Sequence, residues 1–177
     1  MPEIYRKPIV YIVHSPLQYT STVHLAKEYA HLKKLERLLR FAKKNGLKVF
    51  WETNAHTDNE KIEELVRKTE LPKEDIISVP FSISRRYYPK GKFEPSRIIV
   101  AGHYKERCSI HSAEMARQEF QNADLVILRG DFNLSFIYPF IFSGTRMRSF
   151  DADKQHTRVT RALIKAKVRP LSRKLLA

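Results

Sequence analysis

Short apolar runs that alternate with helix-like stretches constrain the fold of this chain more than any other feature. Residues 9–13 (IVYIV) form a continuous, largely β-branched run, as expected of a central parallel strand that is covered on both faces. Further apolar runs follow at 47–53, 76–79, 98–101 and 125–129. This alternation predicts an α/β fold with right-handed crossovers and a mostly parallel sheet.

The stretches between these runs have helical spacing at 22–45, 58–69, 109–121 and 154–167. Gly46 stands where a left-handed helix cap is wanted, and Thr57 with Glu60 has the spacing of a capping box. Residues 168–171 are predicted to add an edge strand, where Pro170 is tolerable. Together these elements predict a three-layer, doubly wound architecture with helices on both faces of the sheet.

Length and cysteine content limit the class of protein. The 177 residues are expected to form a single domain over 1–177, with a basic C-terminal segment at 146–177. The single cysteine excludes an internal disulfide and, without a Cys/His cluster, predicts a cytoplasmic protein without structural zinc. No apolar run reaches the roughly 18 residues of a spanning helix, so no membrane partner is expected.

The charge of the chain predicts a polyanionic partner. The sequence has 33 Lys and Arg against 19 Asp and Glu, a net charge of +14, and the segment 146–177 holds ten basic and two acidic residues. A field of this sign attracts nucleic acid first. The candidate phosphate contacts in this segment are Arg158, Arg161, Lys165 and Arg169, and Arg173 and Lys174 are predicted to lie on the same basic face.

The stretch 80–95 is predicted to be a loop, because it holds three prolines, a glycine and a run of basic and aromatic residues. Basic and aromatic side chains together contact phosphates and stack on bases. The candidates here are Arg85, Arg86, Tyr87, Tyr88, Lys90 and Lys92. The alternative interpretation is a solvated flap beside an active site.

Two segments are predicted to form a ligand site, because ligands of open parallel sheets bind beyond the carboxyl ends of the strands, where the strand order reverses. These segments are HSPLQY (14–19) and GHYKERCSIHS (102–112). Cys108, at a predicted helix start, is a candidate nucleophile or a small buried residue. His14 is a candidate base for it or a polar strand end, and His103 either orients a substrate or faces water.

The stretch RIIVAGHYKERCSIHSAEMA (97–116) resembles the isochorismatase-like cysteine hydrolases, the family of nicotinamidases and carbamoyl-amide hydrolases. The resemblance extends to IVYIVHSPLQY, LKVFWETNAH, LVILRGD and QHTRVTRALIKAKVRPLS. It implies an isochorismatase-like fold and, for an active member, hydrolysis of a small amide by Cys108.

The chain departs from this family at the groups that do the chemistry. The position of the family's aspartate base matches His14, and no lysine matches the third catalytic group near ISVPFS (77–82). Where metal-binding members have Asp-x-His, this chain has Asn54-Ala55-His56, so no metal and no other cofactor is expected.

These departures favour a pseudoenzyme, a degenerate hydrolase-like domain that binds RNA or DNA through its basic surface. One alternative is an active cysteine hydrolase of small amides that uses Cys108 and His14. Another is a basic module that docks on an acidic protein, and a homo-oligomer stays open.

Overall fold

The computed structural model of the chain describes residues 3–16, 25–55, 57–82, 85–86, 88–89, 91–103, 109–129, 132–134 and 167–177. All structural statements concern these residues. Within them, no helix combines the length and the apolar composition that crossing a bilayer requires.

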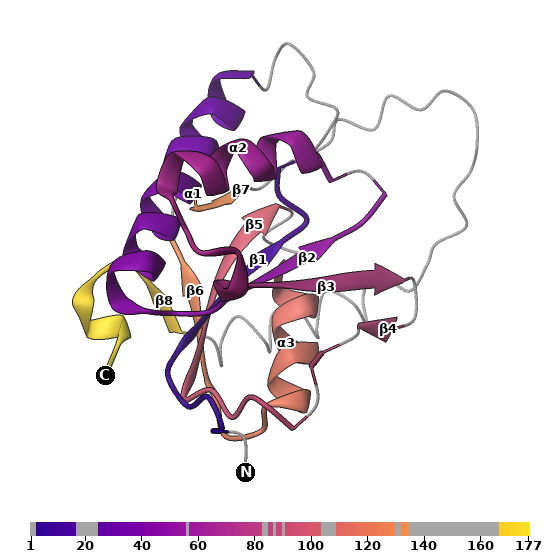
Figure 1. Ribbon diagram of the computed structural model, residues 1–177, viewed down its shortest axis with the longest axis vertical. Helices are drawn as coiled ribbons and strands as arrows, with labels where there is room; N and C mark the ends of the chain where they lie inside the picture. The colour runs from indigo at the N-terminus through magenta and orange to yellow at the C-terminus, as the bar shows by residue number, and fades with distance from the viewer. Residues whose placement is uncertain are drawn as a thin grey trace.

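The fold is α/β and is built on a mostly parallel sheet (Figure 1). Its strands in the described part are β1 (Ile9–Val13), β2 (Val49–Thr53), β3 (Ile76–Ser82), β4 (Arg85–Arg86), β5 (Arg97–His103), β6 (Asp124–Leu128), β7 (Asn133–Leu134) and β8 (Lys167–Arg169). They are ordered β4-β3-β2-β1-β5-β6-β8, with β7 paired to the end of β5. Every pairing is parallel except that of β3 with β4.

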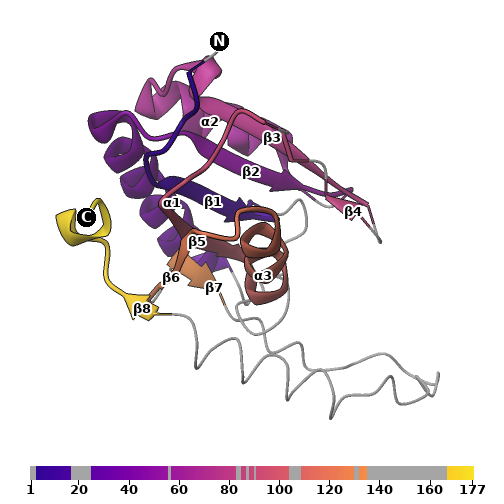
Figure 2. The same ribbon diagram turned by 90° about the horizontal axis from the view of Figure 1, so that it is seen from below.

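Helices cover both faces of the sheet, which confirms the predicted three-layer architecture (Figure 2). The helices are α1 (Leu25–Asn45), α2 (Asn59–Thr69) and α3 (Ile110–Glu119), with short 3-10 turns η2 (Lys73–Asp75) and η5 (Arg173–Leu175). One core cluster joins α1 and α2 to Val10 and Ile12, and the other joins α3 to Tyr11 and Val13. Alternate residues of β1 therefore face opposite helical layers.

The ends of the helices test the predicted caps. Gly46 has φ +58 after the end of α1, as predicted, and Leu47 N donates to Ala42 O at 3.0 Å. The predicted capping box of α2 is wrong, since Asp58 is the N-cap and its Oδ1 accepts from Lys61 N at 3.1 Å. Thr57 Oγ1 instead accepts from Asn54 N at 2.9 Å and closes the preceding turn.

Two segments differ from their predicted form. The stretch from Pro80 is not wholly a loop, because β3 continues to Ser82 and pairs antiparallel with β4. Pro80 is tolerated there because β3 pairs on its outer side only at its last two residues, so the missing N–H costs little. The predicted edge strand of the tail is present as β8, beside β6, while the predicted helix at 154–167 lies almost wholly outside the described residues.

Candidate active site

The strand order reverses between β1 and β5, whose carboxyl ends lie side by side. Val13 pairs with Gly102, as the sequence predicted for these two segments. The approach is so close that a Cβ on Gly102 would lie 2.2 Å from Val13 O, and its φ of +143 also favours glycine. His14, which follows Val13, has φ 50, a conformation that non-glycine residues adopt mainly where the surroundings enforce it.

A buried carboxylate stands beside His14 on the α3 face of the sheet. Glu52, at the end of β2, has no exposed surface, and its Oε1 lies 2.7 Å from His14 Nε2. The same oxygen accepts from Ser112 Oγ at 2.8 Å, and Oε2 accepts from the Tyr11 hydroxyl. Two hydroxyl donors and one imidazole therefore surround a charge that would be costly to bury alone.

Aromatic side chains enclose this cluster. The ring of Phe81 packs edge-on against His14 with centroids 4.9 Å apart, and the Tyr88 hydroxyl lies 3.1 Å from that of Tyr11. Burial, and then the nearby Glu52 charge, raises the pKa of Tyr11 far above its usual value. Tyr11 therefore stays protonated and acts as a hydrogen-bond donor to the carboxylate.

A second buried polar cluster lies on the α1 face at the same end of the sheet. His103 Nε2 lies 3.1 Å from Glu28 Oε2, and His31 Nε2 lies 2.6 Å from Ser15 Oγ. The two imidazole rings meet edge-on with centroids 4.7 Å apart. Trp51 Nε1 donates to Ser15 O at 2.6 Å and fixes the chain that leaves β1.

The ionisation of Glu28 follows from this contact. Burial alone would raise the pKa of its carboxyl group, but the hydrogen bond with His103 and the nearby charges of His103, His31 and Lys61 outweigh burial and lower it. Glu28 and His103 are therefore a carboxylate–imidazole pair. The strand end thus carries one such pair on each face of the sheet.

Cys108, the predicted nucleophile, lies outside the described residues. The residue after it, Ser109, is buried and occupies the N-cap position of α3, and its Oγ donates to His103 O at 2.8 Å. The predicted helix start after Cys108 is thereby confirmed. His14 follows β1, and His103 ends β5 and accepts a hydrogen bond from Ser109. The two predicted segments therefore meet at the carboxyl end of the sheet.

Sequence reasoning missed Glu52, Glu28 and His31. The sequence pattern that could have identified them is a polar residue at a position where the helix or strand pattern predicts an apolar one. Glu52 interrupts the apolar run of β2, and Glu28 and His31 fall on the helical stripe that Leu35, Leu38 and Ala42 continue. A buried polar residue is more informative than an exposed apolar one.

The predicted nucleic-acid contacts that the structure describes belong to strands and turns that are far apart in the sheet. Arg85 and Arg86 form β4 and Arg169 ends β8, the first and last strands of the order. Six strand spacings of about 4.8 Å separate these strands by nearly 30 Å. Lys92 is exposed near Tyr5, towards the opposite end of the sheet from β4.

Tyr88 differs from the expected exposed stacking platform, because it is half-buried and its ring packs against Phe120 with centroids 5.6 Å apart. The remaining predicted contacts lie outside the described residues. They are Tyr87, Lys90, Arg158, Arg161 and Lys165.

The position that holds a metal in part of the resembled family does not fit one here. Asn54 carries an amide in place of a carboxylate, and its Oδ1 accepts from Thr57 Oγ1 at 3.2 Å. His56 lies outside the described residues. Among those described, no group of three His, Cys, Asp or Glu side chains is arranged to hold an ion.

These features define a class of protein: an α/β domain with a polar site at the switch point of a doubly wound sheet. Among solved structures, the pyrazinamidase of Pyrococcus horikoshii, crystallised in complex with zinc, shares this fold with a TM-score of 0.54 and 10% sequence identity. The alignment covers 93% of this chain and 99% of the pyrazinamidase. It supports the resemblance to isochorismatase-like hydrolases at the level of the fold. No protein-family model and no curated protein matches the sequence.

Proposed function

We propose that the chain is a cysteine hydrolase of small amides, in which a histidine held by a buried glutamate replaces the aspartate base of the resembled family. The observation that carries the proposal is the distance of 2.7 Å between His14 Nε2 and Glu52 Oε1, with both side chains buried at the switch point of the sheet. The sequence alone favours the pseudoenzyme. Because of this contact, we propose the active hydrolase instead.

The roles of the residues follow from the arrangement of imidazole and carboxylate. A carboxylate on one ring nitrogen orients the imidazole and stabilises its protonated form, which makes it an effective base for a thiol. Tyr11 and Ser112 hold Glu52 in turn by donating to its oxygens. The family's missing lysine has no counterpart on β3, which instead places the Phe81 ring against His14.

The reaction would proceed in two steps. The Cys108 thiolate attacks the amide carbonyl carbon, and His14, having taken the thiol proton, returns it to the departing ammonia as the C–N bond breaks. A water molecule then attacks the thioester carbon and its proton passes to His14; the C–S bond breaks, the acid product leaves, and the sulfur takes the proton back from His14. The backbone N–H groups at the start of α3 are suited to stabilising negative charge near that helix end.

The test is ammonia release from pyrazinamide, nicotinamide and an N-carbamoyl compound by the purified chain. We expect turnover that is abolished in Cys108→Ser and reduced by about 10²–10⁴-fold in His14→Asn. Glu52→Gln should lower kcat more than it raises KM, because it acts through His14. Folded protein without turnover on all three substrates would instead support the pseudoenzyme interpretation.

A second function, binding of RNA or DNA, is favoured by the net charge of +14. It is independent of the chemistry at the switch point, because a basic surface anywhere on the molecule can contact phosphates. Its test is the salt dependence of oligonucleotide binding, combined below with the location of the surface.

A further inference from the structure

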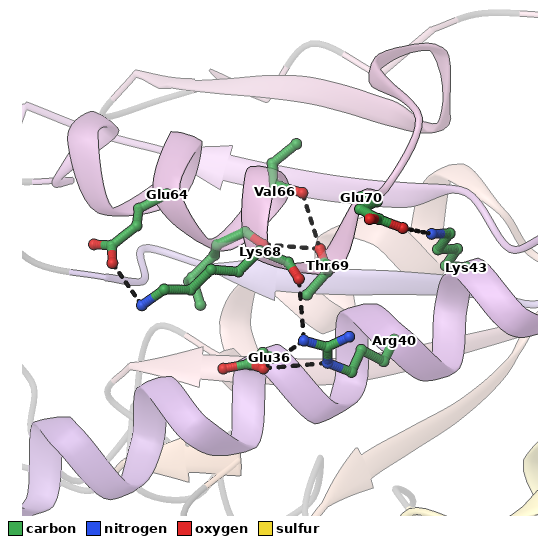
Figure 3. A network of polar contacts seen from close by, with 9 residues as sticks. Glu36, Arg40, Lys43, Glu64, Val66, Lys68, Thr69 and Glu70 are labelled. Carbon is green, nitrogen blue, oxygen red and sulfur yellow. Dashed lines mark hydrogen bonds and ion pairs between the residues drawn. The ribbon is translucent and has the colours of Figure 1, made fainter.

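Some basic residues of the described chain are neutralised by a nearby carboxylate, and others are not. Along the contact of α1 with α2, several cations are paired, as Figure 3 shows for Arg40 with Glu36, Lys43 with Glu70 and Lys68 with Glu64. Lys48 pairs with Asp75 and Lys61 with Asp58 in the same region. These pairs neutralise the positive charge of their cations.

A second group gathers where α1 ends, and none of its members forms an ion pair within the described part of the chain. We name it the basic corner. Its five members are exposed and come from three segments: Lys7, Arg37, Lys44, Arg173 and Lys174.

Contacts between these three segments bring them side by side near the end of α1. Lys7 Nζ lies 3.6 Å from the position that a Cβ would take on Gly46, directly after α1. Ser96 N donates to Arg6 O at 3.1 Å, and Arg97 Nη1 donates to Lys174 O at 3.2 Å, so β5 links the residue before Lys7 to the C-terminal turn. Leu175 is buried in the core cluster that contains α1, and Figures 1 and 2 both show the C-terminal segment beside that helix.

Two carboxylates on the linking elements are paired with other cations. Glu94 contacts Arg6 at 3.4 Å, and Asp124 contacts both Arg97 and Lys167 at 3.2 Å. The positive charge of the corner is therefore not neutralised by these side chains. Arg37 and Lys44 are seven residues apart and lie on the same, outer face of α1.

We infer that the basic corner is the surface through which the chain contacts the phosphodiester backbone of a nucleic acid, an inference that rests on the second proposed function. A backbone presents one charge per nucleotide and is held by several separate cations, as three segments provide here. The corner lies at the amino end of the sheet, away from His14 and Glu52. Binding and hydrolysis therefore do not compete for one site.

The experiment measures fluorescence anisotropy of labelled oligo(dT) and oligo(U) with the full chain at increasing salt. One variant changes the five corner residues to glutamine. A second variant changes only Lys44, Arg173 and Lys174, and its matched control changes three exposed cations elsewhere, Arg67, Lys73 and Arg117. We expect the slope of log K against log salt to fall by about 0.7–0.9 for each phosphate that the corner variant no longer neutralises, and far less in the control.

Each outcome separates the inference from the function on which it rests. If the wild-type chain binds neither oligonucleotide at low salt, nucleic-acid binding itself fails. If it binds and the second variant matches its control, the inference fails while the function stands, and Arg158→Gln with Arg161→Gln and Lys165→Gln then tests the tail. Binding to phosphatidylserine vesicles without binding to oligonucleotides also overturns the inference. Circular dichroism confirms that every variant is folded.

Discussion

At the residue scale, the candidate site depends on polar groups buried together at positions far apart in the chain. Tyr11 and Glu52 are 41 residues apart, and Glu28 and His103 are 75 apart. A sequence pattern shows that Glu52 and Glu28 occupy apolar positions, but it does not show which partners they meet. For this reason the sequence identified His14 and His103 as candidate site residues but did not identify their partners, Glu52 and Glu28.

The Glu28–His103 pair predicts a dependence of stability on pH. Because the pKa of Glu28 is lowered in the folded chain, the unfolded chain takes up the proton first as the pH falls. The contribution of Glu28 is therefore present above its ordinary value of 4.5 and is lost as the pH falls through the lowered folded value. In urea titrations, Glu28→Gln should lower the free energy of unfolding at neutral pH and lessen its decline in acid.

The matched control is Glu63→Gln, since Glu63 is an exposed glutamate on α2. Its acid dependence should follow that of the wild-type chain. If Glu28→Gln retains the full decline in acid, the pairing with His103 does not stabilise the fold.

At the scale of the elements, the sequence predicted the strands and helices well and their ends less well. Continuous apolar runs such as IVYIV specify buried parallel strands because both faces are covered, and this interpretation is confirmed for β1, β5 and β6. The end of β3 was missed because its last residues pair with β4, a contact that a proline-rich composition conceals. The cap of α2 was assigned one residue too early, since Thr57 and Asp58 both suit an N-cap.

The contact of β1 with β5 predicts a severe effect of one added methyl group. Gly102→Ala would place a Cβ 2.2 Å from Val13 O in a backbone conformation that favours glycine. We expect it to lower the free energy of unfolding by more than about 3 kcal/mol, or to prevent folding. Gly91→Ala is the matched control, because Gly91 also has positive φ but nothing lies within 4 Å of its added Cβ.

Gly91→Ala should lower the free energy of unfolding by only about 1–2 kcal/mol, which is the strain of the left-handed conformation alone. Denaturant unfolding of both variants measures the difference. Equal, small losses would show that β1 and β5 separate readily at the switch point, so that the site would lack a rigid frame.

At the scale of the whole molecule, the sheet separates two regions of different chemistry. The carboxyl end holds the imidazole–carboxylate pairs, and the amino end holds the basic corner. The sequence predicted both a polar strand end and a basic surface, and two members of the basic corner, Arg173 and Lys174, belong to the basic segment 146–177 that it indicated. Net charge does not specify location, because the ion pairs that neutralise a cation are set by the fold.

The most direct test of the proposed hydrolase is the reactivity of its thiol, because Cys108 is the only cysteine in the chain. The rate of alkylation by iodoacetamide, followed by mass spectrometry as a function of pH, reports on Cys108 alone, and Cys108→Ser should remain unlabelled. If His14 and Glu52 activate the thiol, the thiolate should form well below the free-thiol pKa of about 8.5. His14→Asn and Glu52→Gln should then move the transition back towards that value. A single transition near the free-thiol value in the wild-type chain, unchanged in both variants, would contradict the activation of Cys108 by His14 and Glu52.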